Sequence, residues 1–318
     1  MSSILVLVDH HDGAVRKSTT ELLTIARRLG DPVAVVIGHG ADKAMEVLSA
    51  YGASSVIAVD APDIDDYLIV PRAEAMLAAA EKVQPAAILL TSNAKTKEIA
   101  AHLAVKTASG IITDAVDVQP GPDGPVTTQS VFAGNYSVQA AVTKGTPIIT
   151  VKPNATTPEE APSSPGMETI EVTFSDLARA VKVTEHAPRE RTGRPDLNEA
   201  AIVVSGGRGT GGDFGPVEQI ADALGAAVGA SRAVVDSGWY PHAFQIGQTG
   251  HVVSPQLYLA AGISGAIQHR AGMQTAKTIV AVNKDAEAPI LDLADFAVVG
   301  DLFTVLPQAT EEIQRRQG

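Results

Sequence analysis

The sequence of 318 residues contains no cysteine and is short of basic side chains. The lack of cysteine excludes disulfide bonds, thiolate catalysis and iron–sulfur ligation by this chain, so redox work would need a bound organic cofactor. Lysine and arginine number 24 against 36 aspartates and glutamates, and the formal net charge is −12. This excess of negative charge argues against nucleic acid and against anionic membrane surfaces as partners.

Long apolar runs are also missing. No run approaches the roughly 18 residues needed to span a bilayer, so we expect no membrane insertion. The N-terminus lacks the basic region and the long apolar stretch of a secretory signal, and we therefore expect a cytoplasmic protein. Aromatic residues make up only 4% of the chain, whereas small aliphatic residues and glycine are abundant. That composition is typical of parallel α/β layers, and the length predicts two domains.

The first half of the chain alternates between helix and strand patterns. A buried strand is predicted at residues 4–8, followed by a helix at 18–28 and a strand at 33–37. The same alternation predicts three further helix and strand pairs, at 43–51 with 55–59, 73–82 with 86–91, and 95–106 with 111–118. A repeated strand–helix–strand order predicts a parallel α/β domain, which we place at residues 1–187.

From residue 127 the apolar pattern changes to period two. The runs at 129–132, 137–144 and 147–151 predict an antiparallel meander at the edge of the sheet. The Pro- and Ser-rich stretch 153–166 predicts a surface loop. Strands near 168–174 and 180–183 are expected to close this domain, a linker is expected at 188–198, and a second domain at 199–318 opens with a strand at 201–204.

Residues 257–273 indicate a nucleotide site. The run 257–263 is apolar enough for a buried parallel strand, and Gly262 and Gly265 permit a tight turn after it. Ser264 is expected as the N-cap of a helix at 265–273. The unpaired N–H groups and the dipole at such a helix start favour an anion by roughly 0.3–1 kcal/mol.

A second strand, predicted at 277–282, ends in the polar residues 283–285. Open α/β sheets bind ligands at the carboxyl ends of their strands. The spacing of Gly207, Gly209 and Gly212 satisfies G-x-G-x-x-G, but an ordinary NAD site also needs an acidic residue about 20 positions further on. Asp236 lies beyond that position, so a loop that contacts phosphate or flavin explains the glycines better.

The segment 257–283 resembles the signature of the electron transfer flavoprotein α-subunit family. The resemblance continues in the segments 205–209, 229–232, 245–250 and 300–303. It implies an N-terminal parallel α/β domain like the adenine nucleotide alpha-hydrolase folds, and a C-terminal doubly wound domain that binds FAD. It further implies a heterodimer with a β-subunit that holds AMP.

The resemblance also implies a function. The family carries single electrons from acyl-CoA and related flavin dehydrogenases to a membrane quinone oxidoreductase, and a carrier of this kind has no substrate turnover of its own. The FAD-binding residues that the resemblance implies are Arg208, Ser231, Arg232, Gln245, Ile246, Gly247, Gln248, Thr249, Gly250, Ser264, Gly265, Ala266, Ile267, Gln268, His269, Asn283, Asp301 and Leu302.

Several of these residues have a specific role in the family. The resemblance implies that Arg232 lies against the flavin ring, that Thr249 bonds N5, and that Asn283 and Asp301 hold the adenosine end. A lone histidine in an apolar helix is usually a satisfied core residue. The resemblance instead implies that His269 bonds flavin O2, where an imidazolium would stabilise the reduced, anionic flavin.

Two other functions remain open at this point. The chain could serve an electron-bifurcating complex that uses NADH and a second FAD, or it could be a nucleotide-binding regulatory protein that relies on its first domain. A metal site at 10–12 is disfavoured, because adjacent histidines diverge and no further ligand is evident.

Overall fold

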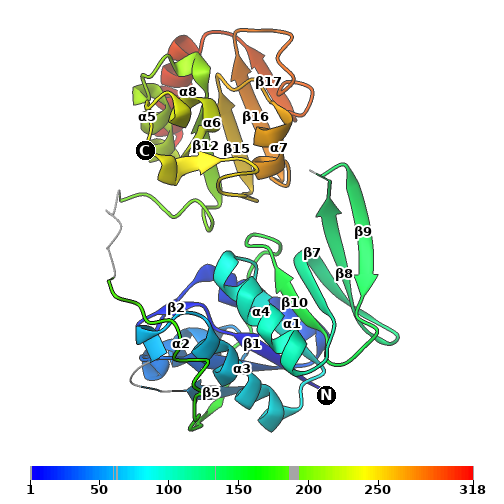
Figure 1. Ribbon diagram of the computed structural model, residues 1–318. Coiled ribbons are helices and arrows are strands. Elements are labelled where there is room, and N and C mark those ends of the chain that lie inside the picture. The colour runs from blue at the N-terminus through cyan, green and yellow to red at the C-terminus, as the bar shows by residue number, and fades with distance from the viewer. Residues whose placement is uncertain (1, 60, 62–63, 133, 186–192, 318) are drawn as a thin grey trace. The chain divides into compact units, whose positions relative to one another are not determined.

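The computed structural model describes residues 2–59, 61, 64–132, 134–185 and 193–317. The chain divides into two compact units, one formed by residues 1–130 and 137–188 and the other by 131–136 and 189–318. Each unit is built around its own sheet (Figure 1). Of the predicted linker at 188–198, residues 188–192 lie outside the described residues.

The sheet of the first unit has nine strands in the order β11-β5-β4-β1-β6-β10-β7-β8-β9. The seven strands from β11 to β7 pair in parallel, and β7 pairs with β8 antiparallel. Their bounds are β1 Ser3–Leu7, β4 Asp31–Ile37, β5 Ser55–Val59, β6 Ala87–Thr91, β7 Ile111–Gly121, β8 Gly124–Val131, β9 Tyr136–Ala141, β10 Ile148–Val151 and β11 Gly166–Thr169. A separate hairpin joins β2 His10–His11 to β3 Ala14–Val15.

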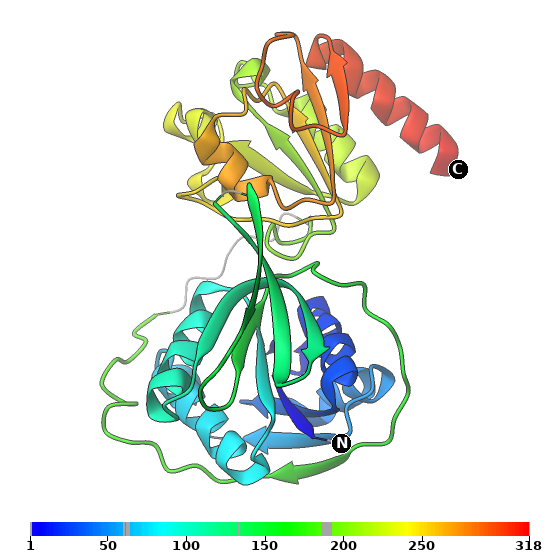
Figure 2. The same ribbon diagram turned by 90° about the vertical axis from the view of Figure 1, so that its right-hand side faces the viewer.

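Helices cover both faces of this sheet. They are α1 Lys17–Leu29, α2 Ala41–Ala50, α3 Val70–Val83 and α4 Ala94–Lys106, with a short 3-10 turn, η1, at Ile64–Asp66. The apolar side chains of α1 and α2 pack into one core and those of α3 and α4 into another. Figure 2 shows the two pairs on opposite sides of the strands. Because β1 is buried on both faces, its residues read as an unbroken apolar run.

The predicted meander is only partly correct. Strands β8 and β9 lie at the edge of the sheet as expected, but β10 lies between β6 and β7 and is parallel to both. All four residues of β10 are buried, which is typical of an interior parallel strand. The strand expected near 180–183 is also wrong, because Lys182 forms only a single bridge with Tyr67. The strand expected at 168–174 is β11, which begins at Gly166 and ends at Thr169.

The second unit contains a six-stranded sheet in the order β14-β13-β12-β15-β16-β17, with every neighbouring pair parallel. The strands are β12 Ile202–Gly206, β13 Ala227–Ser231, β14 Gln245–Ile246, β15 Leu257–Ala261, β16 Thr278–Asn283 and β17 Phe296–Val299. The helices are α5 Gly215–Leu224, α6 Arg232–Asp236, α7 Ile267–Met273 and α8 Leu302–Gln317, with 3-10 turns η2 at Arg208–Thr210 and η3 at His242–Phe244.

The order of these strands confirms a doubly wound domain. From β12 the chain builds β13 and β14 on one side, then returns to place β15, β16 and β17 on the other. Helices α5 and α8 bury their apolar side chains on one face, and Met273 of α7 packs on the opposite face. The direction of winding changes between β12 and β15, and ligands bind at the carboxyl ends of strands at such a point. None of the helices in the described part of the chain is long and apolar enough to cross a membrane.

Candidate functional site

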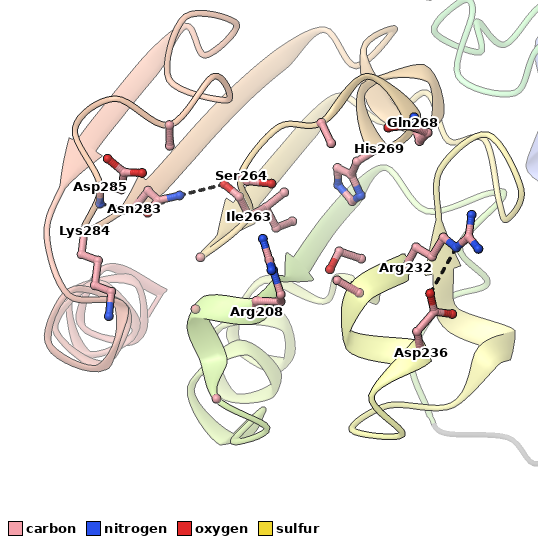
Figure 3. Close-up of a pocket in the computed structure, with 17 residues that line it drawn as sticks. Arg208, Arg232, Asp236, Ile263, Ser264, Gln268, His269, Asn283, Lys284 and Asp285 are labelled. Carbon is pink, nitrogen blue, oxygen red and sulfur yellow. Dashed lines mark hydrogen bonds and ion pairs between the residues drawn. The ribbon is translucent and has the colours of Figure 1, made fainter.

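A cavity of about 760 Å³ opens at the carboxyl ends of the parallel strands in the second unit (Figure 3). Its walls come from the segments that follow β12, β13, β15 and β16, on both sides of the point where the winding changes. The size lies in the upper part of the range for cofactor and small-molecule sites.

Two of these loops touch backbone to backbone. The N–H of Gly209, after β12, donates to the carbonyl of Gly262, after β15, at 2.9 Å. A Cβ on Gly262 would lie 2.7 Å from the Cα of Gly209, and Gly262 has φ +64. Only glycine permits both the left-handed backbone and this close approach. The glycines therefore bring the two loops together and form the floor of the cavity.

The helix after β15 starts later than the sequence predicts. Its N-cap is Ala266, and Ile267 is its first residue, so the expectation that Ser264 caps the helix is wrong. Gly265 has φ +86, and a Cβ there would lie 2.4 Å from the backbone nitrogen of Ile290. The carbonyl of Ser264 accepts a bond from that nitrogen. The turn thus continues for two residues past Ser264, whose exposed side chain is left at the cavity.

Cations outnumber anions around the cavity. Arg208, Arg232 and Lys284 line it, against Asp236 and Asp285. Arg232 pairs with Asp236 at 3.2 Å, but both side chains are about 60% exposed, so this pair contributes little to stability. Within the described part of the chain Arg208 has no carboxylate partner, and its side chain points into the cavity (Figure 3). A local positive excess in a chain of net charge −12 favours an anionic ligand.

His269 points from α7 into the centre of this site (Figure 3). Its Nε2 lies 2.9 Å from the hydroxyl of Tyr258 on β15, its Nδ1 is buried, and the backbone of Ile246 hydrogen-bonds to the ring. Burial lowers the pKa of His269 to about 4. The ring is therefore neutral at pH 7 in this environment, which differs from the imidazolium expected from the resemblance.

The loop from Gln245 to Gly250 lies against α7. The backbone N–H of Gln248 donates to the carbonyl of Gln268 at 2.8 Å, and a Cβ on Gly272 would lie 2.4 Å from the nitrogen of Gly247. The side-chain amide of Gln245 donates to the Thr249 hydroxyl at 3.0 Å, which leaves the Thr249 proton free for another acceptor. The loop adjoins the cavity without lining it.

The residues predicted for the adenosine end have internal partners. The Asn283 amide donates to the carbonyl of Ile263 at 2.8 Å, and its oxygen accepts from the backbone of Asp285. The Asp301 carboxylate accepts from the backbone of Phe303 and so caps α8. Leu302 is buried in the core. Asn283 lines the cavity, whereas Asp301 and Leu302 do not.

The structure thus brings part of the predicted set together. The predicted residues that line the cavity are Arg208, Ser231, Arg232, Ser264, Ala266, Gln268, His269 and Asn283. Those that lie outside its lining are Gln245, Ile246, Gly247, Gln248, Thr249, Gly250, Gly265, Ile267, Asp301 and Leu302. The lining residues that were not in the predicted FAD-binding set are Gly209, Gly211, Ala233, Asp236, Gly262, Ile263, Lys284, Asp285 and Ala288. Four of these nine, Gly209, Ala233, Ile263 and Lys284, directly adjoin a predicted residue, which was the available signal.

Comparison with known proteins shows two matching family models. One, described as the electron transfer flavoprotein domain, matches residues 4–177, and the other, the electron transfer flavoprotein FAD-binding domain, matches residues 196–274. Together they span most of the chain. The chain belongs to the electron transfer flavoprotein alpha-subunit family.

Relatives of this family are similar along their whole length. The electron transfer flavoprotein subunit alpha of Mycobacterium leprae (strain TN) is 51% identical, with 100% of both chains covered. That of Mycobacterium tuberculosis (strain ATCC 25618 / H37Rv) is 49% identical with the same coverage. The corresponding subunit of Bacillus subtilis (strain 168) is 36% identical, covering 98% of this chain and 97% of the relative.

FAD is the cofactor of the domain matched at 196–274, and the residues of the cavity fit it. The site lies where a dinucleotide binds a doubly wound sheet, Arg208, Arg232 and Lys284 in its lining suit a pyrophosphate, and Gly209 and Gly262 leave open the space that a Cβ would fill. When bound, FAD supplies the one-electron redox chemistry of an electron transfer flavoprotein. The protein chain supplies binding, orientation and charge.

Proposed function

We propose that this chain is the FAD-carrying large subunit of a heterodimer, and that it shuttles single electrons from acyl-CoA and related flavin dehydrogenases to a quinone oxidoreductase. The observation that carries the proposal is the cavity at the carboxyl ends of β12, β13, β15 and β16, most of whose lining lies within the FAD-binding match. The small subunit, with AMP, completes the complex. The chain then acts as a carrier and turns over no substrate.

The chemistry of the lining residues supports a division of roles. Arg208 and Lys284 would face the pyrophosphate, where fixed positive charge is most useful. Ser231 and Arg232, at the start of α6, would lie at the flavin end, together with His269. Thr249 would reach the flavin from the loop next to α7 through its free hydroxyl proton.

The decisive experiment is stepwise anaerobic reduction of the complex. The chain would be co-expressed with a candidate β-subunit, isolated by gel filtration and reduced by an acyl-CoA dehydrogenase with its substrate. We expect a yellow 1:1 complex with one FAD that accepts electrons from the dehydrogenase. Two flavins and oxidation of NADH would favour bifurcation instead, and a colourless protein that binds adenine nucleotide would overturn both.

A matched pair of arginine variants tests the site itself. We expect Arg208→Gln to weaken FAD binding about 10-fold, because a charge-assisted hydrogen bond contributes roughly 1.5–3 kcal/mol. Arg315→Gln removes another exposed arginine, which lies on α8, pairs with Glu312 and is outside the cavity lining, and it should leave FAD affinity unchanged. Equal affinities for the two variants would exclude Arg208 from the site.

A further inference from the structure

His251 closes the loop 245–250, which the family resemblance places at the flavin and which we call the flavin loop. The backbone N–H of His251 donates to the carbonyl of Gln245 at 2.7 Å, and its own carbonyl accepts from the N–H of Gly247 at 3.1 Å. The chain therefore enters and leaves the loop beside the same residue. Whatever holds His251 in place also holds the base of the flavin loop.

The ring of His251 joins this loop to two other segments of the second unit. Its Nδ1 lies 2.9 Å from the side-chain oxygen of Asn198, and its Nε2 lies 3.0 Å from the carbonyl oxygen of Ala243 on η3. Asn198 belongs to residues 194–200, which lead into β12 and which we call the entry segment. One side chain thus connects the flavin loop, the entry segment and η3.

The entry segment is a firm support for the loop. Leu197 and Ala200 are buried in the core of the second unit. Arg194 bonds both oxygens of the Asp222 carboxylate on α5, through Nε at 2.6 Å and a terminal nitrogen at 3.0 Å. Core packing and a bidentate ion pair hold this segment against the sheet, so a loop bonded to it is held as well.

Both atoms that face the ring of His251 are hydrogen-bond acceptors. The carbonyl of Ala243 can only accept. The amide of Asn198 is oriented by Asp196, because its nitrogen donates to the Asp196 carboxylate at 2.9 Å and its oxygen is then turned toward the ring. A neutral imidazole has one N–H and satisfies one of the two acceptors, whereas an imidazolium satisfies both. The two bonds therefore form together only when the ring is protonated.

Histidine is the side chain that ordinarily changes its charge near neutral pH. The charged and titratable groups on the segments that hold the ring are Arg194, Asp196 and Glu199 in the entry segment and His242 in η3, and the flavin loop itself carries none. These groups stay the same in every variant of His251, so a comparison of variants at one pH isolates the ring.

We propose that His251 is a positioning residue that holds the flavin loop in its binding geometry, with two hydrogen bonds when its ring is protonated and one when it is neutral. This inference rests on the proposed function, since it takes the flavin loop as part of the FAD site. A loop that is released part of the time lowers the apparent affinity for its ligand by the fraction of time it is out of place. The contribution of His251 to FAD affinity should therefore grow as the pH falls.

Titration of the heterodimer with FAD at two pH values tests this role. His251→Phe keeps a ring and removes both bonds, and we expect FAD affinity to fall about 10-fold at pH 6 but only about 3-fold at pH 8, because a second, charge-assisted bond is lost at the lower pH. His251→Gln keeps a donor that does not titrate, so its affinity relative to His251→Phe should be the same at both pH values. His102→Phe, at a half-buried histidine on α4 of the first unit, is the matched control and should equal the wild type at each pH.

Nitrogen and proton NMR of the wild-type heterodimer, labelled in histidine, gives a readout that does not depend on any variant folding. At pH 6 both ring N–H protons of His251 should exchange slowly with water, because both are hydrogen-bonded. Fast exchange of either proton would overturn the proposal, as would a His251→Phe effect of equal size at the two pH values. A wild-type heterodimer that binds no FAD would overturn the proposed function instead, and the exchange of the ring protons would still show whether His251 makes both bonds.

Discussion

Among the described histidines, His269 alone is almost fully buried. Its ring hydrogen-bonds to the Tyr258 hydroxyl, and no carboxylate in the described part of the chain compensates there for a positive charge. Charging the ring would require removing an imidazolium from water, which is why its pKa falls to about 4. At physiological pH the protein therefore holds a neutral hydrogen-bonding group at this position, and the fixed positive charge of the site comes from arginine and lysine.

This burial predicts a specific dependence of stability on pH. The unfolded histidine has a pKa of about 6.5, so between that value and about 4 the unfolded chain binds more protons and the folded state loses stability as pH falls. From pH 8 to pH 5 the wild type should lose about 2 kcal/mol more than His269→Gln. Urea unfolding of the FAD-free protein measures the difference, and parallel curves would refute the prediction.

The shape of the cavity depends on the two loops that meet at its floor. The loop after β12 and the loop after β15 share the hydrogen bond between Gly209 and Gly262, and neither glycine has space for a Cβ. Leu302 of α8 also lies against Gly262, so the floor of the cavity and the core are continuous there. The shape of the site therefore depends on backbone contact more than on any polar side chain.

A pair of alanine substitutions separates the cost of backbone strain from the cost of a steric clash of the added Cβ. Gly262 and Gly225 have nearly the same backbone angle, φ +64 and φ +62, but a Cβ on Gly225 would meet nothing within 4 Å. Gly225→Ala should cost about 1 kcal/mol of folding free energy through its left-handed backbone alone. Gly262→Ala should cost more than this and abolish FAD retention, as measured by urea unfolding and flavin absorbance. Equal costs would mean that the loop contact is unimportant.

At the scale of the whole molecule, each unit has its own sheet and its own pair of cores. All the residues that line the cavity, from Arg208 to Ala288, belong to the second unit. If the ligand is bound in this cavity, its binding free energy should stabilise the second unit first.

Calorimetry of the FAD-free chain should then show two unfolding transitions. Adding FAD should raise the midpoint temperature of only one of them. At a free concentration of about 1,000 times the dissociation constant, FAD should stabilise the second unit by about 4 kcal/mol. The transition of the first unit should keep its midpoint. A single transition that shifts as a whole would show instead that the two units unfold together.

The elements of this chain were largely predictable from local pattern. The helix expected at 18–28 is α1, and the strand expected at 33–37 lies within β4. Such elements carry their own signal, because an apolar period and end residues are local in the sequence. The pairing of strands in a sheet joins segments that are far apart in the sequence. The position of β10 between β6 and β7 was therefore not predicted.

For the candidate site, too, some features could be predicted from the sequence and others could not. By itself the sequence determined that redox work by a chain without cysteine would need a bound organic cofactor, and its resemblance to the family indicated the segments expected to bind FAD. Only the tertiary structure decided that Asn283 and Asp301 bond to their own backbone, that Tyr258 holds His269, and that the imidazole is neutral. Composition and spacing are properties of the chain, whereas burial and hydrogen-bond partners arise only when distant segments pack together.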